Sequence, residues 1–261
     1  MPELPEVETI IRELRAKISG KELRELFIFD KRIGRLRVSL PLKITGVDRH
    51  GKFIVIHSSR GKILLHLRMS GRLQFSEKGK SKRSHKSERA IFVFGDGSVL
   101  KFFDPRRFGT IEWRKGKLPE LGLNPLGPEF TYKNFRDILH SRSRTIKNLL
   151  LDQKIVAGLG NIYVDESLWF AKINPRRKSD SFSDMEIKRL RTAIVQVLKE
   201  AIRRGGFTLR DYKKTTGKKG SYQLFRKAYS REGLPCSRCR SRIKRIKIGG
   251  RGTYFCPKCQ A

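Results

Sequence analysis

The sequence predicts an α+β fold, in which an N-terminal helix leads into an antiparallel β-sandwich or barrel and a mainly helical half follows. Three patterns carry this prediction. Apolar residues recur at helical spacing before residue 20, short apolar or alternating runs fill residues 24–113, and helical spacing returns after residue 128. The length of 261 residues accommodates one or two domains.

The N-terminal helix is predicted by a single apolar face. Pro5 suits the first helical turn and Gly20 suits the helix end, because their backbone preferences match those two places. The residues of the apolar face are Val7, Ile10, Ile11, Leu14 and Ile18.

Six short runs are predicted to be strands of the β-sandwich or barrel. They read KITGV, KFIVIHS, KILLHLR, AIFVF, SVLKFF and TIEW, and Gly-Lys, Asp-Gly and Ser-Gly turns separate them. Residues 77–89 hold six Lys or Arg and few apolar side chains, so a mobile loop between strands is expected there.

The second half begins after a Gly- and Pro-rich stretch, residues 116–128, which is predicted to be a linker. Ser183 and Glu186 have the spacing of a capping box, and Gly205-Gly206 suits the end of the helix that this box begins. The apolar residues of that helix are Leu190, Ile194, Val197, Leu198 and Ala201.

The charge of the chain indicates a polyanionic partner. The 60 Lys and Arg residues against 25 Asp and Glu give a net charge of +35 and a pI near 10.7. Nucleic acid is the first candidate and an anionic membrane surface the second; a basic ribosome-associated or thermophilic protein is the alternative without a specific partner.

No apolar run approaches the roughly 18 residues that a membrane span requires. Hydrophobic residues make up 38% of the chain, enough for a core, which argues against disorder.

All four cysteines lie near the C-terminus, in two C-x2-C pairs separated by 16 residues. They are Cys236, Cys239, Cys256 and Cys259. Two such pairs supply the four thiolates of a tetrahedral zinc site without an open position, so one structural zinc ion is predicted; unrelated thiols or disulfides are the alternative. The absence of cysteine from the rest of the chain fits a reducing, intracellular location. Six Lys or Arg residues between the pairs, together with Arg238 inside the first pair, would give the module a phosphate-binding surface.

The N-terminus carries a second candidate for chemistry. Removal of Met1 before the small Pro2 would leave a secondary amine, and a terminal amine is partly unprotonated at neutral pH, unlike a Lys amine. Its attack on an aldehyde carbon would give an iminium ion, which withdraws electrons from neighbouring bonds. Glu3 could then transfer protons beside it. The alternative is that Glu3, like Glu8, only stabilises the helix N-terminus.

Motifs along nearly the whole chain resemble those of the formamidopyrimidine-DNA glycosylases, which are related to endonuclease VIII. They are M-P-E-L-P-E-V-E-T at the N-terminus, R-x-G-K-F around Lys52, H-L-R-M-S-G at 66–71, D-P-R-R-F-G at 104–109, G-L-G-N-I-Y-V-D-E-S-L at 158–168, Y-x-R-x-G-x-P-C at 229–236 and R-G-T-x-x-C-P-x-C-Q at 251–260. Each motif is short, but their joint occurrence in this order is specific. The Leu in P-E-L-P-E favours the formamidopyrimidine branch.

The resemblance implies a particular domain plan and partner. A β-sandwich domain would span residues 1–115, a linker 116–128, a helix–two-turn–helix DNA-binding domain 129–225 and a zinc ribbon 226–261. The partner would be double-stranded DNA with an oxidised purine, 8-oxoguanine or formamidopyrimidine, that is flipped into a pocket. The protein would be a monomer without a membrane partner, in the cytoplasm of a bacterium and associated with the nucleoid.

The resemblance also implies roles for single residues. Pro2 would attack C1′ and expel the base, Glu3 would help the sugar ring to open, and β- and δ-elimination would cut the strand, with Lys52 assisting the first step and Arg251 the second. The DNA-binding residues would be Met69, Arg106, Arg107, Phe108, His66, Lys147 and Asn161. Met69, Arg106 and Phe108 would fill the space of the flipped base, and His66, Lys52 and Lys147 would contact phosphates. Core packing of Met69 and Phe108, a solvated turn at Arg106 and Arg107, and a simple helix cap at Asn161 are the alternatives.

Two departures from the family pattern lie near the expected site: the first adds a charge beside Met69, and the second concerns the choice among damaged bases. Arg68 stands where the family often has Gly, and the segment before Tyr229 reads T-T-G-K-K-G-S-Y-Q-L-F in place of the usual Gly-Tyr-Phe-Gln. Specificity for oxidised pyrimidines, as in endonuclease VIII, is therefore one alternative function. A zinc-ribbon protein that binds damaged DNA without catalysis is the other.

Overall fold

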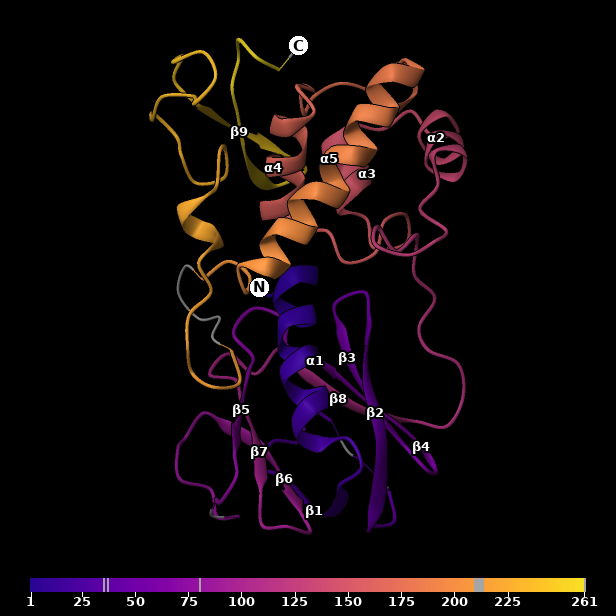
Figure 1. The fold of residues 1–261 in the computed structure, drawn as a ribbon, viewed down its shortest axis with the longest axis vertical. Coiled ribbons are helices and arrows are strands. Elements are labelled where there is room, and N and C mark those ends of the chain that lie inside the picture. Colours follow the sequence, from indigo (N-terminus) through magenta and orange to yellow (C-terminus); the bar gives the residue numbers. More distant parts are fainter. Residues whose placement is uncertain (35, 37, 80, 209–213, 261) are drawn as a thin grey trace. The chain divides into compact units, whose positions relative to one another are not determined.

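Figure 1 presents a computed structural model of the chain, which describes residues 1–34, 36, 38–79, 81–208 and 214–260. The described residues form two compact units. The first unit joins residues 1–119 with residues 202–223, and the second joins residues 120–201 with residues 224–261. A late segment of the chain therefore packs with the N-terminal unit, whereas the sequence prediction drew one helical domain from residue 129 to residue 225.

The N-terminal unit combines one helix with one antiparallel sheet of eight strands (Figure 1). The elements are α1 (Leu4–Ile18), β1 (Glu22–Ile28), β2 (Leu42–His50), β3 (Phe53–Ser58), β4 (Gly61–His66), β5 (Arg72–Ser76), β6 (Glu88–Phe94), β7 (Val99–Phe103) and β8 (Thr110–Arg114). Their order in the sheet is β5-β7-β6-β1-β2-β3-β4-β8.

The sheet consists of two halves with a narrow junction. β1 and β2 pair only through Glu22 with Lys43 and Leu23 with Leu42, so four strands lie on each side of this join. One apolar core contains residues of both halves together with the predicted apolar face of α1. The predicted antiparallel β-sandwich with an N-terminal helix is thereby confirmed.

Two strands of the sheet, β1 and β5, were not among the six predicted runs. β1 reads ELRELFI, and Leu23 is its only buried residue, so its sequence lacks the apolar alternation that identifies a strand. β5 has only five residues and buries two of them, Leu73 and Phe75. Both strands form because their neighbours in the sheet supply the hydrogen bonds and the core.

The predicted basic loop lies between β5 and β6. Its far end is fixed by Glu88, a buried carboxylate that accepts hydrogen bonds from the backbone and side chain of Ser84 and pairs with Lys101 at 3.2 Å. The described Lys and Arg side chains of residues 77–87 are exposed.

The second unit is helical and ends in a two-stranded hairpin. Its elements are α2 (Tyr132–His140), α3 (Ile146–Leu151), α4 (Asn161–Phe170), η1 (Ser179–Ser181), most of α5 (Asp184–Arg203), β9 (Lys244–Ile248) and β10 (Arg251–Phe255); the short η2 (Tyr222–Leu224) spans the boundary of the units. The capping box that begins α5 is confirmed, since Ser183 and Glu186 exchange side-chain to backbone hydrogen bonds. None of the helices in the described part of the chain has the length and apolar character for a membrane span.

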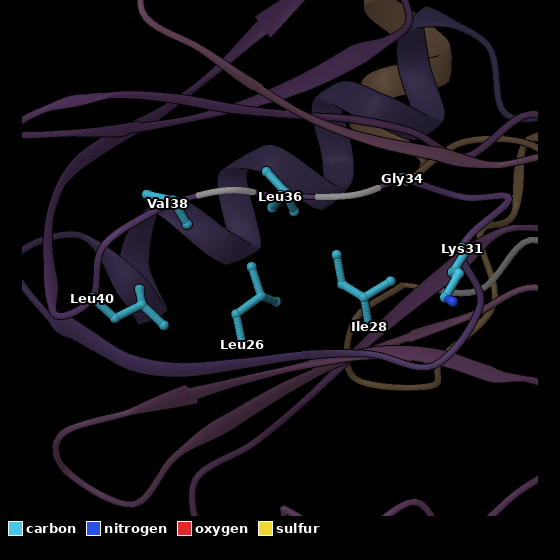
Figure 2. A pocket seen from close by; sticks show the side chains of 7 residues that line it. All are labelled: Leu26, Ile28, Lys31, Gly34, Leu36, Val38 and Leu40. Atoms are coloured by element: carbon cyan, nitrogen blue, oxygen red, sulfur yellow. The ribbon is translucent and has the colours of Figure 1, made fainter.

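One cavity of about 250 Å³ opens beside β1 in the N-terminal unit (Figure 2). Its lining is almost wholly aliphatic and comprises Leu26, Ile28, Leu36, Val38 and Leu40, with Gly34 and Lys31. A damaged base is recognised through its polar edges, and this lining offers hardly any partner for them. This cavity therefore does not have the lining of a pocket for a damaged base.

Candidate active site and zinc centre

The N-terminal amine candidate lies at the start of α1. Met1 is 44% exposed, whereas Pro2 is buried and Glu3 is only 3% exposed. Glu3 is the N-cap of α1 and forms a reciprocal capping box with Glu6: each side chain accepts a hydrogen bond from the backbone N–H of the other residue. The carboxyl group that resemblance assigns to catalysis is thus held in one place beside Pro2.

Glu6 extends this arrangement to the late segment of the N-terminal unit. Its Oε2 accepts from the backbone N of Glu3 at 2.8 Å, and its Oε1 accepts from the backbone N of Phe207 at 2.7 Å. Residues 209–213, which follow, lie outside the described residues. Glu6 was not among the predicted site residues, although its spacing from Glu3 is that of a capping box. Glu8, by contrast, pairs with Arg12 and Arg49, in agreement with a structural role.

Lys52 and His66 are both predicted DNA contacts, and both are 6% exposed. Burial, then the charges of Arg68 and Lys52, lower the pKa of His66 to about 3. His66 Nδ1 accepts a hydrogen bond from the backbone N of Arg68 at 2.9 Å, which leaves the proton of the neutral ring on Nε2. His66 is therefore a neutral hydrogen-bond donor at physiological pH, and its direct environment includes the Lys52 charge.

The lowered pKa of His66 predicts a pH dependence of stability. The unfolded chain protonates His66 near its ordinary pKa of 6.5, while the folded chain keeps it neutral down to about 3, so acid favours unfolding. Between pH 6.5 and 5, the free energy of unfolding should fall by up to about 1.4 kcal/mol per pH unit because of this group. Urea titrations of His66→Gln should have a flatter pH dependence. His85→Gln, at an exposed position, is the control; an unchanged slope in His66→Gln would contradict the assignment.

Two loops of the N-terminal unit carry the predicted space-filling residues. Met69 is 43% exposed and Phe108 is 51% exposed, which excludes core packing for both. The guanidinium of Arg106 lies 4.9 Å from the centre of the Phe108 ring. Arg107 has a φ of +60° and pairs with Asp30 at 3.5 Å, so its side chain has a protein partner within the unit.

The structure corrects the predicted role of Lys147. This side chain has no exposed surface, and its Nζ forms a 2.5 Å ion pair with Asp165 Oδ1. A fully buried ammonium group does not contact a DNA phosphate directly, so the role of Lys147 is internal. The partner lies 18 residues later in the chain, and the sequence offered no sign of the pairing.

Asp165 connects three elements of the second unit. Its Oδ1 accepts from Lys147 of α3, and its Oδ2 accepts from the backbone N of Tyr254 in β10 at 3.0 Å. Burial raises the pKa of Asp165 to about 7, while the charge of Lys147 and the two hydrogen bonds act in the opposite direction. The buried ion pair therefore joins α3 and α4 to the C-terminal hairpin.

Asn161 and Arg251 meet at this same junction. Asn161 Nδ2 donates to the backbone O of Gly252 at 2.9 Å, which places Asn161 beside the exposed Arg251. The N-cap of α4 is Gly160, so Asn161 does not cap the helix as one alternative supposed. Asn161 Oδ1 is buried and, among the described residues, has no hydrogen-bond partner. Two of the predicted site residues are thereby brought together.

Glu166 is a further residue that the sequence analysis missed. Its carboxylate has no exposed surface and accepts 2.8 Å hydrogen bonds from three consecutive backbone N–H groups, those of residues 227–229. Burial raises its pKa, and these hydrogen bonds partly oppose the rise. Asp165 and Glu166 together hold both the hairpin and the segment that precedes it. The sequence feature that could have indicated this role is the pair of adjacent acids, Asp165 and Glu166, in the largely apolar helix α4.

The four cysteines form the predicted metal centre. Their sulfur atoms lie within 4.8 Å of one another, and Cys239 and Cys256 are 3.5 Å apart. A tetrahedral zinc ion with bonds of about 2.3 Å separates its sulfur ligands by about 3.8 Å, so the group has the right size and the right donors. Four protein ligands leave no position for a substrate. The centre is therefore a structural zinc site, and it fixes the ends of the β9–β10 hairpin.

Removal of zinc should be visible through Trp169. This residue packs with Cys236 and Cys256 in one buried cluster, and the Arg238 guanidinium lies 3.7 Å from the centre of its ring. In a Trp113→Phe background Trp169 is the only tryptophan. A thiol-blocking mercurial should release one zinc ion per chain and change Trp169 fluorescence in proportion, with loss of DNA affinity. A zinc-free protein with unchanged fluorescence and full affinity would contradict the site.

Three known domain families match successive parts of the chain. Residues 1–111 match the formamidopyrimidine-DNA glycosylase N-terminal domain, residues 121–213 match the H2TH domain of the same glycosylases, and residues 233–261 match a zinc finger found in FPG and IleRS.

Whole-chain relatives agree with these matches. A formamidopyrimidine-DNA glycosylase of Exiguobacterium sp. is 41% identical over all of this chain and 99% of its own. The crystal structure of MutM (Fpg) from Thermus thermophilus is 39% identical, with a TM-score of 0.90 over 99% of this chain and 98% of that one. Two structures of Fpg from Lactococcus lactis are also similar, each with a TM-score of 0.90 over 99% of both chains. One is a complex with DNA that contains an abasic site and is 34% identical to this chain, and the other is a complex with DNA that contains an oxidised pyrimidine and is 35% identical. The chain is therefore a DNA glycosylase of the formamidopyrimidine-DNA glycosylase family.

Proposed function

We propose that this protein excises oxidised purines, 8-oxoguanine and formamidopyrimidines, from double-stranded DNA and then cuts the strand at the resulting abasic site. The observation that carries the proposal is the capping box of Glu3 and Glu6, which fixes a carboxyl group beside Pro2 at the end of a rigid helix. Binding of DNA alone requires neither a terminal proline nor a fixed carboxyl group next to it.

The reaction begins after Met1 is removed and the Pro2 nitrogen becomes a free secondary amine. This nitrogen attacks C1′ of the damaged nucleoside, the glycosidic bond breaks, and the base leaves with its bonding electrons and a proton. Glu3 donates a proton to the ring oxygen as the C1′–O4′ bond opens, which yields a Pro2 iminium ion. The preorganised position of Glu3 removes the need to order its side chain during this step.

The iminium ion then promotes two eliminations. Loss of a proton from C2′ expels the 3′ phosphate, and a second elimination expels the 5′ phosphate, so the strand is cut on both sides of the lost nucleoside. Lys52 assists the first elimination and Arg251 donates a proton in the second. Hydrolysis of the remaining iminium ion releases Pro2 for another cycle.

DNA binding is distributed over both units. In the first unit, exposed Met69 and Phe108 fill the space of the extruded base, and Arg106 and Arg107, which flank Phe108 in its loop, contact the DNA. Neutral His66 donates a hydrogen bond to a phosphate. In the second unit, Asn161 and Arg251 bind a phosphate at the junction of α4 and β10. Zinc holds the hairpin that carries Arg251 and takes no part in bond breaking.

We also infer that the protein acts as a monomer on chromosomal DNA in the cytoplasm of a bacterium, without a membrane partner. The named relatives are bacterial proteins, and the net charge of +35 suits a partner with a continuous phosphate backbone.

A panel of damaged duplexes tests the proposal. Duplexes with 8-oxoguanine opposite cytosine, a formamidopyrimidine, an oxidised pyrimidine or no lesion are incubated with the protein, and released bases and cut strands are measured. Excision of both purine lesions with products of β,δ-elimination is the expected result. Preference for the pyrimidine lesion would favour the endonuclease VIII alternative, a possibility raised by the Lactococcus lactis complex. Tight binding of damaged DNA without cleavage of any duplex would overturn the enzymatic proposal.

A further inference from the structure

The two loops that carry the exposed apolar residues share one buried carboxylate. The Met69 loop comprises residues 67–71 and the Phe108 loop comprises residues 104–109. Asp104 begins the second loop and has no exposed surface. Its Oδ1 accepts from the Ser70 hydroxyl at 2.5 Å, and its Oδ2 accepts from the backbone N of Gly109 at 2.7 Å. One side chain therefore bonds to both loops.

Further hydrogen bonds fix Asp104 itself. Its backbone N donates to Ser87 O at 2.8 Å, and its backbone O accepts from Arg89 Nε at 2.7 Å. The backbone N of Arg106 donates to Oδ1 at 3.2 Å. Ser87 is the residue before β6, and Arg89 lies at the start of that strand and is only 4% exposed. The backbone of Asp104 is thus attached to β6 and the residue before it, while its carboxylate bonds to the two loops.

The loops need such a partner because their own backbone geometry is unfavourable. Arg68 and Arg107 have φ values of +49° and +60°, a region that side chains other than Gly rarely adopt. Gly109 has no room for a side chain, since a Cβ there would lie 2.5 Å from the Phe102 ring and 3.2 Å from Asp104 Oδ2. Met69 is 43% exposed and Phe108 is 51% exposed, so core packing does not hold either loop. Loops with such strained backbone keep one conformation only where surrounding hydrogen bonds fix it.

We propose that Asp104 is a positioning residue for base extrusion, which holds Met69 on one loop and Arg106 and Phe108 on the other in a single fixed arrangement before DNA binds. This inference rests on the proposed function. Three side chains that already have their relative positions can enter the space of the extruded base without the cost of ordering two independent loops. Asp104 acts through the loops and does not touch the reacting atoms.

The chemistry at the sugar should depend much less on Asp104. A preformed abasic site has no base to extrude, so its cleavage requires Pro2 and the elimination steps but not the same degree of loop order. Loss of Asp104 should therefore separate the two activities, which general damage to the fold would lower together.

The test compares Asp104→Asn with Asp96→Asn. Asp96 is the control because it also accepts hydrogen bonds from the hydroxyl and the backbone N of one Ser, Ser98, in a turn without space-filling residues. Unlike Asp104 it is exposed and also pairs with Lys21 at 2.6 Å. The amide of Asp104→Asn places a donor against the N–H groups of Arg106 or Gly109. Excision of 8-oxoguanine and cleavage of an abasic-site duplex are measured, with base extrusion followed by the fluorescence of 2-aminopurine next to the lesion.

Asp104→Asn should slow base extrusion and excision by about 10- to 100-fold, because a charged hydrogen-bond acceptor is lost, while abasic-site cleavage changes by less than about threefold. Asp96→Asn should change neither. Ser70→Ala should have a smaller effect than Asp104→Asn and should add little to it in the double variant. Normal extrusion by Asp104→Asn, or equal loss of excision and abasic-site cleavage, would overturn the inference. If the unaltered protein itself cuts no damaged duplex, the proposed function fails instead.

Discussion

Replacement of Pro2 by Gly, or addition of residues before it that block its nitrogen, should lower the yield of borohydride-trapped protein–DNA adduct at least about 100-fold. Borohydride reduces the iminium ion to a stable amine, so the yield reports the nucleophile directly. The blocked chain has no secondary amine at the N-terminus, and the Gly variant offers a primary amine without the ring that holds the proline nitrogen in place.

The control for this experiment is Glu8→Gln, at a position of α1 whose side chain pairs with Arg12 and Arg49. It should leave the adduct yield unchanged. A blocked chain that still gives the adduct in full yield would move the nucleophile to another amine. Lys52 would then be the first candidate because it is a buried amine whose charge acts on His66, a predicted DNA contact.

Lys147→Met should destabilise the second unit by about 3–5 kcal/mol, because it leaves the Asp165 carboxylate buried without its partner. Urea unfolding measures the loss, and hydrogen exchange should assign it to α3, α4 and the C-terminal hairpin. The double variant Lys147→Met/Asp165→Asn should recover part of the stability, since no unpaired charge remains. Lys154→Met, at an exposed position, is the matched control and should change stability by less than about 0.5 kcal/mol.

The same variants decide between the internal role of Lys147 and the phosphate contact that was predicted. Removal of a phosphate contact lowers the slope of log affinity against log salt by about 0.9. A slope change of this size in Lys147→Met, together with normal stability, would restore the phosphate role and contradict the buried pair.

Local patterns in the sequence predicted the elements that local chemistry determines. The α1 helix follows from the spacing of Val7 to Ile18, the start of α5 from Ser183 and Glu186, and the zinc centre from the spacing of its cysteines. The exposed positions of Met69 and Phe108 agree with the prediction from family motifs. The roles of Pro2, Glu3, Lys52 and Arg251 remain predictions.

Partners distant in the chain were beyond prediction. Nothing in the composition of residues 146–151 distinguishes a solvent-facing Lys147 from one that is paired with Asp165. The contact of Glu6 with Phe207 joins residues 201 positions apart, and it belongs to the segment that packs with the N-terminal unit. The hydrogen bond of Asp104 with Ser70 likewise connects two loops whose proximity depends on the finished sheet.

The most direct test of the central claim, that Pro2 is the nucleophile, is to locate the covalent bond. The protein is trapped with borohydride on a duplex containing 8-oxoguanine opposite cytosine, digested with trypsin and nuclease, and analysed by mass spectrometry. The sugar remnant is expected on the Pro2 nitrogen, in the tryptic peptide of residues 2–12. A remnant on Lys52 or any other lysine, or the absence of an adduct from a protein that cuts this duplex, would contradict it.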